Sequence, residues 1–218
     1  SNIFNTPSFP SGYASWIHGG WVSAADLVVN SGEDFELTQV EAQILVYGVG
    51  ASPPPAPITN VTLNYYIDSN GLPGTLIGTE TVSPTTQTYL SSTPATNGGH
   101  VYMLTLDVTP FTFQGTSSGS TTYWIGLTNA SGGGQIYWIW DYANGAGGNY
   151  NGCNNYTTGT SGVFGSVSGD FYYEFSGNCI LIGVYGCTDP IACNYDASAT
   201  IDDGSCDLPN GCDDPLYI

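Results

Sequence analysis

The stretch Leu37-Thr-Gln-Val-Glu-Ala-Gln-Ile-Leu-Val-Tyr47 decides the fold class of this chain. Apolar residues occupy every second position from Val40 to Val46, and the positions between them are mostly polar. A period of two places the apolar side chains on one face of a strand and the others on the opposite face. The stretch therefore predicts a β-strand with one face in a core and a mostly polar face outward.

Further segments along the chain alternate in the same way or are rich in β-branched and aromatic residues, and Gly, Pro, Asn or Ser bound each of them. They are Ala24–Val29, Val61–Ile67, Thr75–Val82, Val101–Val108, Thr122–Thr128, Gln135–Trp140 and Asp170–Phe175. No segment has a convincing helical period. Strands at this spacing predict an all-β fold, a β-sandwich of the jelly-roll-like type.

Composition excludes several classes of partner. The chain has no Lys or Arg, 18 Asp and Glu, and a formal net charge of −18. Proteins that bind nucleic acids or anionic membranes need cationic side chains, so we expect neither partner. No apolar run is long enough to predict a membrane span. The natural small partners of such a chain are divalent cations and uncharged sugars.

The cysteines indicate an oxidising environment. Six cysteines, a mostly neutral polar surface and a first residue Ser1 without an apolar export segment are typical of a processed secreted protein or a fragment of one. Cys153 and Cys179 flank the last predicted strand, and a disulfide between them would fix the long loop 144–169 to the sandwich. We therefore expect an extracellular or cell-surface location, with disulfides rather than a zinc site.

A change in composition near residues 179–186 divides the chain. Aromatic strand segments stop there, and a Cys/Asp-rich segment begins. The predicted organisation is an N-terminal arm (1–19), a β-sandwich (20–180), a small disulfide-stapled, loop-rich repeat (181–210) and the start of a further repeat (211–218).

Residues 186–206, Gly-Cys-Thr-Asp-Pro-Ile-Ala-Cys-Asn-Tyr-Asp-Ala-Ser-Ala-Thr-Ile-Asp-Asp-Gly-Ser-Cys, resemble a known short repeat. Its form is GCTDPxAxNYxxxAxxDDGSC, and it occurs in tandem near the C-termini of secreted surface proteins of type IX-secreting bacteria. The resemblance implies a disulfide between Cys187 and Cys206, the recurrent positions of the pattern, with Cys193 and Cys212 as the other pair. Six cysteines allow many connectivities, so other pairings stay open.

The larger part of the chain resembles secreted bacterial jelly-roll domains of cell-surface proteins. The resemblance is carried in order by Ala25-Asp-Leu, Val61-Thr-Leu-Asn-Tyr-Tyr-Ile-Asp, Gly71-Leu-Pro-Gly, Tyr123-Trp-Ile-Gly-Leu and Asp170-Phe-Tyr-Tyr-Glu-Phe. Those domains commonly carry an Arg in the strand that corresponds to Leu63–Ile67. This chain has none, which argues against a charge-mediated role.

Acidic residues gather in the C-terminal repeat. Seven of the 18 acids lie in the last 32 residues, where no cation can pair with them. Dense carboxylates supply the oxygen ligands that Ca²⁺ prefers, although the spacing is not that of an EF-hand loop. The predicted ligands are Asp189, Asn194, Asp196, Asp202 and Asp203. The alternative is a set of solvated acids in a disulfide-stapled turn.

Aromatic residues alternate along one predicted strand. Trp138, Trp140 and Tyr142 fall on one face, and Tyr137 and Ile139 fall on the other. If the first face is exposed, it is a stacking platform suited to sugar rings. If it is buried, it belongs to the sandwich core, which is the usual place for aromatic residues in this fold.

Catalytic signals are weak. His18 and His100 are the histidines of the chain, each beside a pair of glycines, and no Gly-x-Ser-x-Gly elbow accompanies them. Carboxylates of a glycosidase pair could come from Glu33, Asp34, Glu36, Glu41, Asp141 and Glu174, but spacing does not identify them. Asn-x-Ser/Thr sequons at Asn60, Asn129 and Asn155 suit an exported protein. We expect a protein that is not an enzyme.

The leading hypothesis is a structural surface protein, an adhesin or the subunit of an extracellular filament, with a calcium-binding repeat at its end. The alternative is a carbohydrate-binding module of a secreted enzyme. The N-terminal arm is either laid along its own sandwich or donated to a neighbour, where Ile3, Phe4 and Phe9 would fill pockets. Donation repeated head to tail makes a homo-oligomer or filament, and removal of residues 1–16 is expected to abolish it.

Overall fold

The computed structural model describes residues 13–17, 19–49, 57–92, 99–141, 155–158, 164–166, 170–171 and 173–208. Within these ranges the chain is all-β. The described part contains no helix that is long and apolar enough to cross a membrane. Several residues discussed above lie outside the ranges: Ile3, Phe4, Phe9, His18, Tyr142, Cys153 and Cys212.

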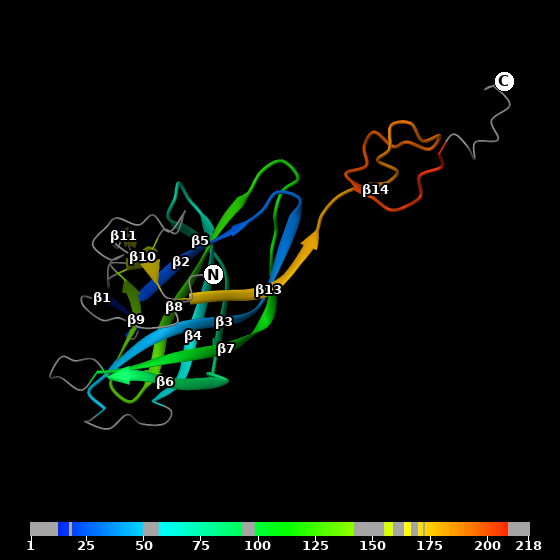
Figure 1. Cartoon of the computed structure of the whole chain (residues 1–218). Coiled ribbons are helices and arrows are strands. Elements are labelled where there is room, and N and C mark those ends of the chain that lie inside the picture. Colours follow the sequence, from blue (N-terminus) through cyan, green and yellow to red (C-terminus); the bar gives the residue numbers. More distant parts are fainter. Residues whose placement is uncertain are drawn as a thin grey trace, which may run out of the picture.

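Two antiparallel sheets form the body of the molecule (Figure 1). The first sheet has the order β1 (Tyr13–Trp16), β9 (Gln135–Asp141), β3 (Glu33–Tyr47), β7 (His100–Phe113) and β6 (Thr86–Ser92). In addition, β12 (Asp170–Phe171) pairs with β9, and β13 (Tyr173–Leu181) pairs with β3. The second sheet has the order β11 (Phe164–Ser166), β10 (Asn155–Thr158), β2 (Val22–Val29), β8 (Thr121–Gly132), β4 (Ile58–Asp68) and β5 (Pro73–Val82). The predicted all-β sandwich is confirmed.

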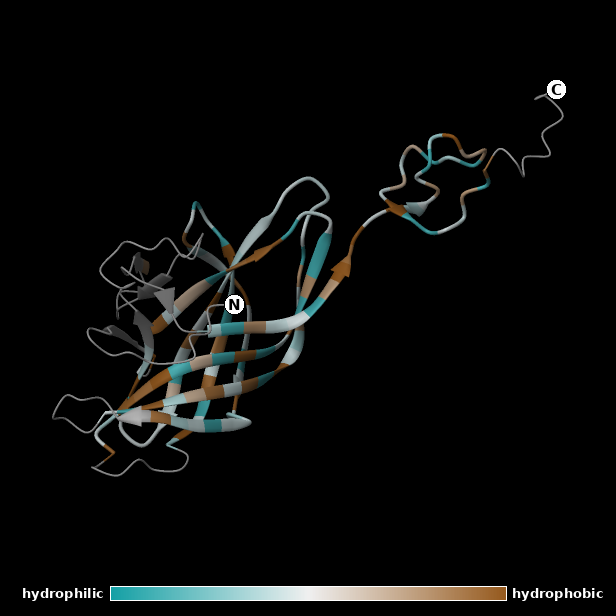
Figure 2. Ribbon diagram, viewed as in Figure 1, coloured by the Kyte–Doolittle hydropathy of each residue, from teal (hydrophilic) through white to brown (hydrophobic). Residues whose placement is uncertain are grey.

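The core lies between the sheets. Every second residue of β3 from Val40 to Val46 is fully buried, as the alternation predicts. The second sheet contributes Leu63 of β4 and Ile125 of β8 to the same cluster. Figure 2 shows hydrophobic and hydrophilic positions alternating along these strands. Each such aliphatic side chain contributes about 1.5–3 kcal/mol when it is fully buried.

The other face of β3 is less polar than predicted. Leu45 is buried there, and Val101 of β7 and the rings of Tyr47 and Tyr137 pack around it. Gln43, on the same face, is also buried. Leu45, the apolar residue among the alternating polar positions, therefore belongs to a small second cluster on the outer face of this sheet.

Strand β3 begins earlier than the sequence predicts. It starts at Glu33 rather than at Leu37, because β13 pairs with its acidic first half. Asn178 of β13 donates a hydrogen bond from Nδ2 to Glu36 Oε1 over 3.0 Å. Acidic residues are rare in strands, and here neutral donors on the neighbouring strand compensate for them.

The sandwich also begins before the predicted boundary at residue 20. Residues Tyr13–Trp16 pair with β9 of the same chain, and Ile17 is fully buried in the core. This part of the predicted arm is therefore a strand of the chain's own first sheet. The rest of the arm, residues 1–12, lies outside the described residues.

A small unit follows the sandwich at the end of β13 (Figure 1). The last backbone hydrogen bond to the sandwich runs from Ile182 N–H to the Gly32 carbonyl. Beyond it, β14 (Tyr185–Gly186) pairs in parallel with β15 (Ile201–Asp202), and a disulfide joins Cys187 to Cys206. The predicted disulfide is confirmed. In the chain-entropy account a disulfide that closes a loop of this size stabilises the folded unit by about 3 kcal/mol.

A partly buried carboxylate contact ties β4, β5 and β7 together. The Tyr65 hydroxyl donates to Glu80 Oε1 over 2.5 Å, and the Thr109 N–H donates to Glu80 Oε2 over 3.0 Å. Burial, and then the hydrogen bond to Glu80, raise the pKa of Tyr65 above its usual value. Tyr65 therefore remains a proton donor to Glu80 across the physiological range.

We predict that Tyr65→Phe lowers the free energy of unfolding by about 1.5–3 kcal/mol, because it removes a donor from an ionised acceptor. Tyr123→Phe is the matched control, since that hydroxyl donates to the neutral Gln114 carbonyl; its expected cost is about 1 kcal/mol. Urea denaturation of both variants measures the difference. Equal costs for the two variants would contradict the role given to Glu80.

Candidate functional site

The five predicted calcium ligands are all described, and each makes a hydrogen bond inside the C-terminal unit. Three of the carboxylates accept a backbone N–H two residues further on. The pairs are Asp189 Oδ1 with Ile191 (3.0 Å), Asp202 Oδ1 with Gly204 (3.1 Å) and Asp203 Oδ1 with Ser205 (2.9 Å). Gly204 has a φ of 76°, which confirms that a glycine serves the tight turn there.

Asp196 and Asn194 have the same kind of role. Asp196 Oδ1 accepts both the N–H and the hydroxyl of Ser198, at 2.8 and 2.6 Å. Asn194 binds the loop segment that follows β15: its Nδ2 donates to the Ser205 carbonyl, and its Oδ1 accepts the Asp207 N–H, both over 2.7 Å. These contacts are side-chain turns that fix the loop-rich backbone.

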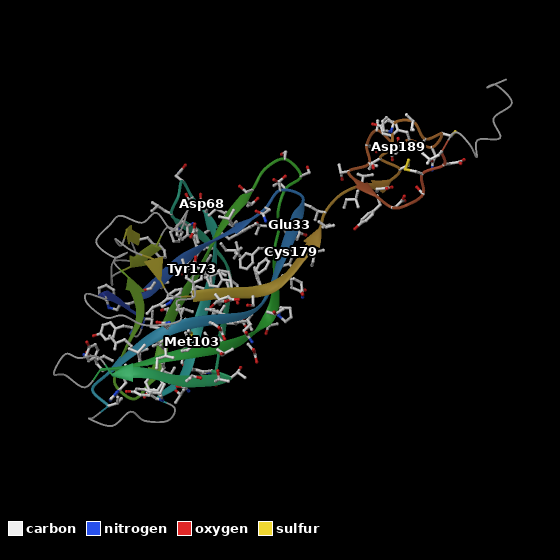
Figure 3. The ribbon with its side chains drawn as sticks, viewed as in Figure 1. Glu33, Asp68, Met103, Tyr173, Cys179 and Asp189 are labelled. Atoms are coloured by element: carbon white, nitrogen blue, oxygen red, sulfur yellow. A yellow bond between two sulfur atoms is a disulfide. The ribbon has the colours of Figure 1, made fainter. Side chains whose placement is uncertain are left out.

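The carboxylates of the unit do not converge. Among the described residues, no group of three or more His, Cys, Asp or Glu side chains lies close enough to hold a metal ion. Figure 3 shows Asp189 in the C-terminal unit, apart from the labelled acids Glu33 and Asp68 of the sandwich. The described geometry thus gives the acids a structural role, and calcium binding by Asp189, Asn194, Asp196, Asp202 and Asp203 stays a prediction.

Two of these turns lower the pKa of their carboxylate. The Ser198 hydroxyl, followed by its N–H, lowers the pKa of Asp196 below its usual value. The hydroxyl and N–H of Ser205 do the same for Asp203. Both carboxylates therefore remain negative to a lower pH than free aspartate.

Of the two alternatives for the aromatic face, Trp138 takes the second, a place in the sandwich core. Its side chain is fully buried in the core, and its ring packs edge-on against Tyr173, with centroids 6.0 Å apart. Trp138 lies on the same face of β9 as Ile136, two residues earlier, and both side chains belong to the core cluster between the sheets. Trp140 lies on β9, but its side chain and all of Tyr142 are outside the described part.

The sequence analysis missed a cluster on the outer face of the second sheet. Trp124 Nε1 donates to Asp68 Oδ1 over 2.9 Å, and the Gly71 N–H donates to Asp68 Oδ2 over 3.1 Å. Tyr66 packs beside the buried Trp124, and the Phe164 ring lies edge-on to Tyr66 at 5.6 Å. The alternation in Asn64-Tyr-Tyr-Ile-Asp68 could have placed these side chains on one face.

Polar groups of this cluster already have partners. Asn64 Oδ1 accepts the Thr79 hydroxyl over 2.8 Å, and Asn64 Nδ2 donates to the Tyr66 hydroxyl over 3.0 Å. Asp26, in register with Trp124, is buried as well. The arrangement stabilises the packing of β4, β5 and β8 rather than presenting free groups to a ligand.

Of the predicted catalytic residues, Glu41 of β3 and Glu174 of β13 lie directly opposite each other in the ladder. His100 is buried beside the Tyr89 ring, and His18 is not described. Asp34 accepts the Gly115 N–H, and Glu41 accepts the Thr105 hydroxyl, so both acids link strands or loops of the sandwich. An open depression near Gly48 is lined by four glycines, Val49, Pro57 and Thr59, and has no carboxylate, histidine or cysteine in its lining.

The cysteines follow the prediction in part. Cys187–Cys206 is present, and Cys193 is also disulfide-bonded. Its predicted partner, Cys212, is not described. The predicted Cys153–Cys179 bond is wrong in this structure: Cys179 is an exposed free thiol, hydrogen-bonded to Glu33 (Figure 3). Burial and the neighbouring Glu33 carboxylate raise the pKa of the Cys179 thiol.

The serine contacts generate a pH prediction with an internal control. We expect Ser198→Ala to raise the pKa of Asp196 toward its ordinary value of 3.8 and to leave the pKa of Asp203 unchanged. We expect Ser205→Ala to raise the pKa of Asp203 and to leave that of Asp196 unchanged. Because the folded-state pKa values are lowered, the turns are fully stabilised above pH ~4 and lose that stabilisation as the pH falls through the folded pKa. NMR titration of the carboxyl carbons measures both values. A change in the pKa of both Asp196 and Asp203 in either variant would contradict the assignment of each lowered pKa to its own serine.

Comparison with known proteins assigns no family. No protein-family model matches the chain, and no curated protein matches it. The resemblances of residues 186–206 and of the sandwich therefore remain predictions that rest on the residues quoted above.

Proposed function

We propose that this protein is an extracellular structural or adhesive surface module that associates with copies of itself through its sheet edges, as the subunit of a filament. The observation that carries the proposal is that the described edge strands β5 and β6 have almost no charged side chains. Exposed edge strands pair readily with other chains unless charged residues, prolines or bulges prevent it.

Two edges of the sandwich are long and nearly uncharged. β6, at the edge of the first sheet, has no acidic residue, and β5, at the edge of the second, has Glu80, which is held by Tyr65 and Thr109. β5 also leaves Leu76 and Ile77 exposed. Backbone donors and acceptors along such strands suit the addition of another strand.

A carbohydrate-binding role has weaker support. Trp138, one of three predicted platform residues, is in the core, and the polar groups around Trp124 are hydrogen-bonded to one another. Glycan binding by Trp140 and Tyr142 remains the alternative. A hydrolase has weaker support as well, since His100 is buried beside the Tyr89 ring, and Asp34 and Glu41 accept hydrogen bonds within the sandwich.

For assembly we predict that the full chain forms regular fibres visible by electron microscopy, and that removal of residues 1–12 abolishes them. The deletion stops at residue 12 because Tyr13–Trp16 belong to the first sheet. Removal of residues 209–218 together with Cys193→Ser, which avoids an unpaired thiol where Cys193 is disulfide-bonded, is the control and should leave assembly intact. A far-UV and thermal unfolding comparison establishes that both truncated chains fold.

For the repeat we propose Ca²⁺ binding by Asp189, Asn194, Asp196, Asp202 and Asp203, supported by dense carboxylates in a chain without cationic side chains. Calorimetric titration of the full chain should give a saturable calcium signal that Asp202→Ala weakens. Asp107→Ala in the sandwich also removes one negative charge and should leave the calcium signal unchanged. No signal at millimolar calcium would leave the acids as turn-forming residues alone.

A further inference from the structure

The strand β13 connects the sandwich to the C-terminal unit (Figure 1). All nine of its residues lie within the ladder with β3, from Tyr173 opposite Ala42 to Leu181 opposite Glu33. β3 is paired on its other side with β7. The ladder therefore extends over about 30 Å and joins β13 to a strand that the first sheet holds from both sides.

The first half of β13 is anchored in the core. Tyr173 is buried, and the Phe175 ring packs against it with centroids 4.3 Å apart. A bulge follows, where a Cβ on Gly177 would lie 1.9 Å from the Glu36 carbonyl oxygen. Beyond the bulge, Asn178 Nδ2 donates to Glu36 Oε1 over 3.0 Å. Movement of β13 along β3 would thus break core contacts and ladder bonds together.

The junction after β13 has no flexible linker. The Ile182 N–H donates to the Gly32 carbonyl of the sandwich over 2.9 Å. Two residues later, the Val184 carbonyl accepts the Thr200 N–H of the C-terminal unit, also over 2.9 Å. Gly183 between them is packed as well, since a Cβ there would lie 2.4 Å from Thr200 Oγ1. A pull on the C-terminal unit is therefore passed directly to β13.

The turn that receives Ile182 is itself held in place. The Gly32 N–H donates to the Thr116 carbonyl over 2.8 Å. Asn30 Nδ2 donates to Glu33 Oε1 over 2.6 Å. These bonds join the turn to the first residue of β3 and to the loop between β7 and β8, so the sandwich side of the junction is fixed.

The disulfide gives the C-terminal unit a short covalent path. Cys187 and Cys206 are 19 positions apart in the sequence, but their Cα atoms lie 4.7 Å apart. Tension that enters at Gly183 passes from Cys187 to Cys206 through the two sulfur atoms. Residues 194–205, which contain the turns of Asp196 and Asp202, are bypassed by this path.

The direction of a pull decides how a ladder resists it. A force along the strand axis loads all hydrogen bonds of the ladder together, whereas a force across its end breaks them one after another. β13 is antiparallel to β3, so its last residue points away from the end of β3 at Tyr47. A pull on the C-terminal unit against that far end of the sandwich therefore shears the ladder along its axis.

We propose that β13 is a load-bearing strand, which holds the sandwich to its C-terminal unit under tension by shear against β3. The β3–β13 ladder is then the first element to yield, because the path through the unit is closed by a covalent disulfide. This inference goes beyond the proposed function and does not require self-assembly, since any surface module that is held through its C-terminal side has to resist a pull there.

Single-molecule pulling of the full chain tests the proposal with one strand and two anchors. One handle is at the C-terminus, and an azide-bearing amino acid replaces either Gln135, at the far end of the sandwich, or Ser31, in the turn before β3. Both positions are exposed. The Gln135 anchor shears the ladder, and the Ser31 anchor peels it from Leu181. The shear geometry should need roughly twofold more force, or more than that, because its hydrogen bonds are loaded together.

Thermal unfolding of both labelled chains checks that they fold. Equal rupture forces for the two anchors would overturn the role given to β13. With intact disulfides, the C-terminal unit should show no opening step before the ladder ruptures, and a reducing agent should add such a step at lower force. An opening step without the reducing agent would also overturn the proposal. Because each molecule is pulled singly, a full chain that forms no fibres but resists shear would remove the proposed function and leave this inference standing.

Discussion

No Lys or Arg is present to neutralise the 18 acids of this chain, so the carboxylates of the fold depend on neutral N–H and O–H donors. Glu80 is held by Tyr65 and Thr109, and Asp68 by Trp124 and Gly71. Hydrogen bonds to an ionised acceptor contribute more than neutral ones, about 1.5–3 kcal/mol each. The abundance of Thr, Asn, Tyr and Gln thus has a physical reason: these residues supply the donors that cations supply elsewhere.

Several of these donors come from a neighbouring strand, so the same constraint couples strand pairing to carboxylate solvation. Gln39 of β3 and Thr85, just before β6, both donate to Asp107 of β7, and together they lower the pKa of that acid. A sheet built in this way has neutral polar side chains where many proteins place lysines. The edge strands β5 and β6 are therefore nearly uncharged, which links the composition to the proposed assembly.

The sequence predicted the interior better than the borders of the fold. Alternation in β3 identified the core correctly because burial on one face is a local, period-two property. It did not predict that β3 starts at Glu33, since β13 stabilises those acids from 138 or more positions away along the chain, as the contact from Ser176 to Thr38 illustrates. β1 and the Trp124 cluster were missed for the same reason. Spacing could not distinguish calcium ligands from turn-forming acids, because both roles use Asp and Asn in short loops.

The turns of the C-terminal unit also bear on how it can bind a cation. Each of Asp189, Asp196, Asp202 and Asp203 uses Oδ1 to accept a backbone N–H. A cation can bind the second oxygen of each carboxylate, or the remaining lone pair of Oδ1, without breaking a turn. In the predicted tandem array of such units, the carboxylates would repel one another at neutral pH. Divalent cations would then act mainly by relieving that repulsion, and the disulfide Cys187–Cys206 maintains the fold of each unit with or without them.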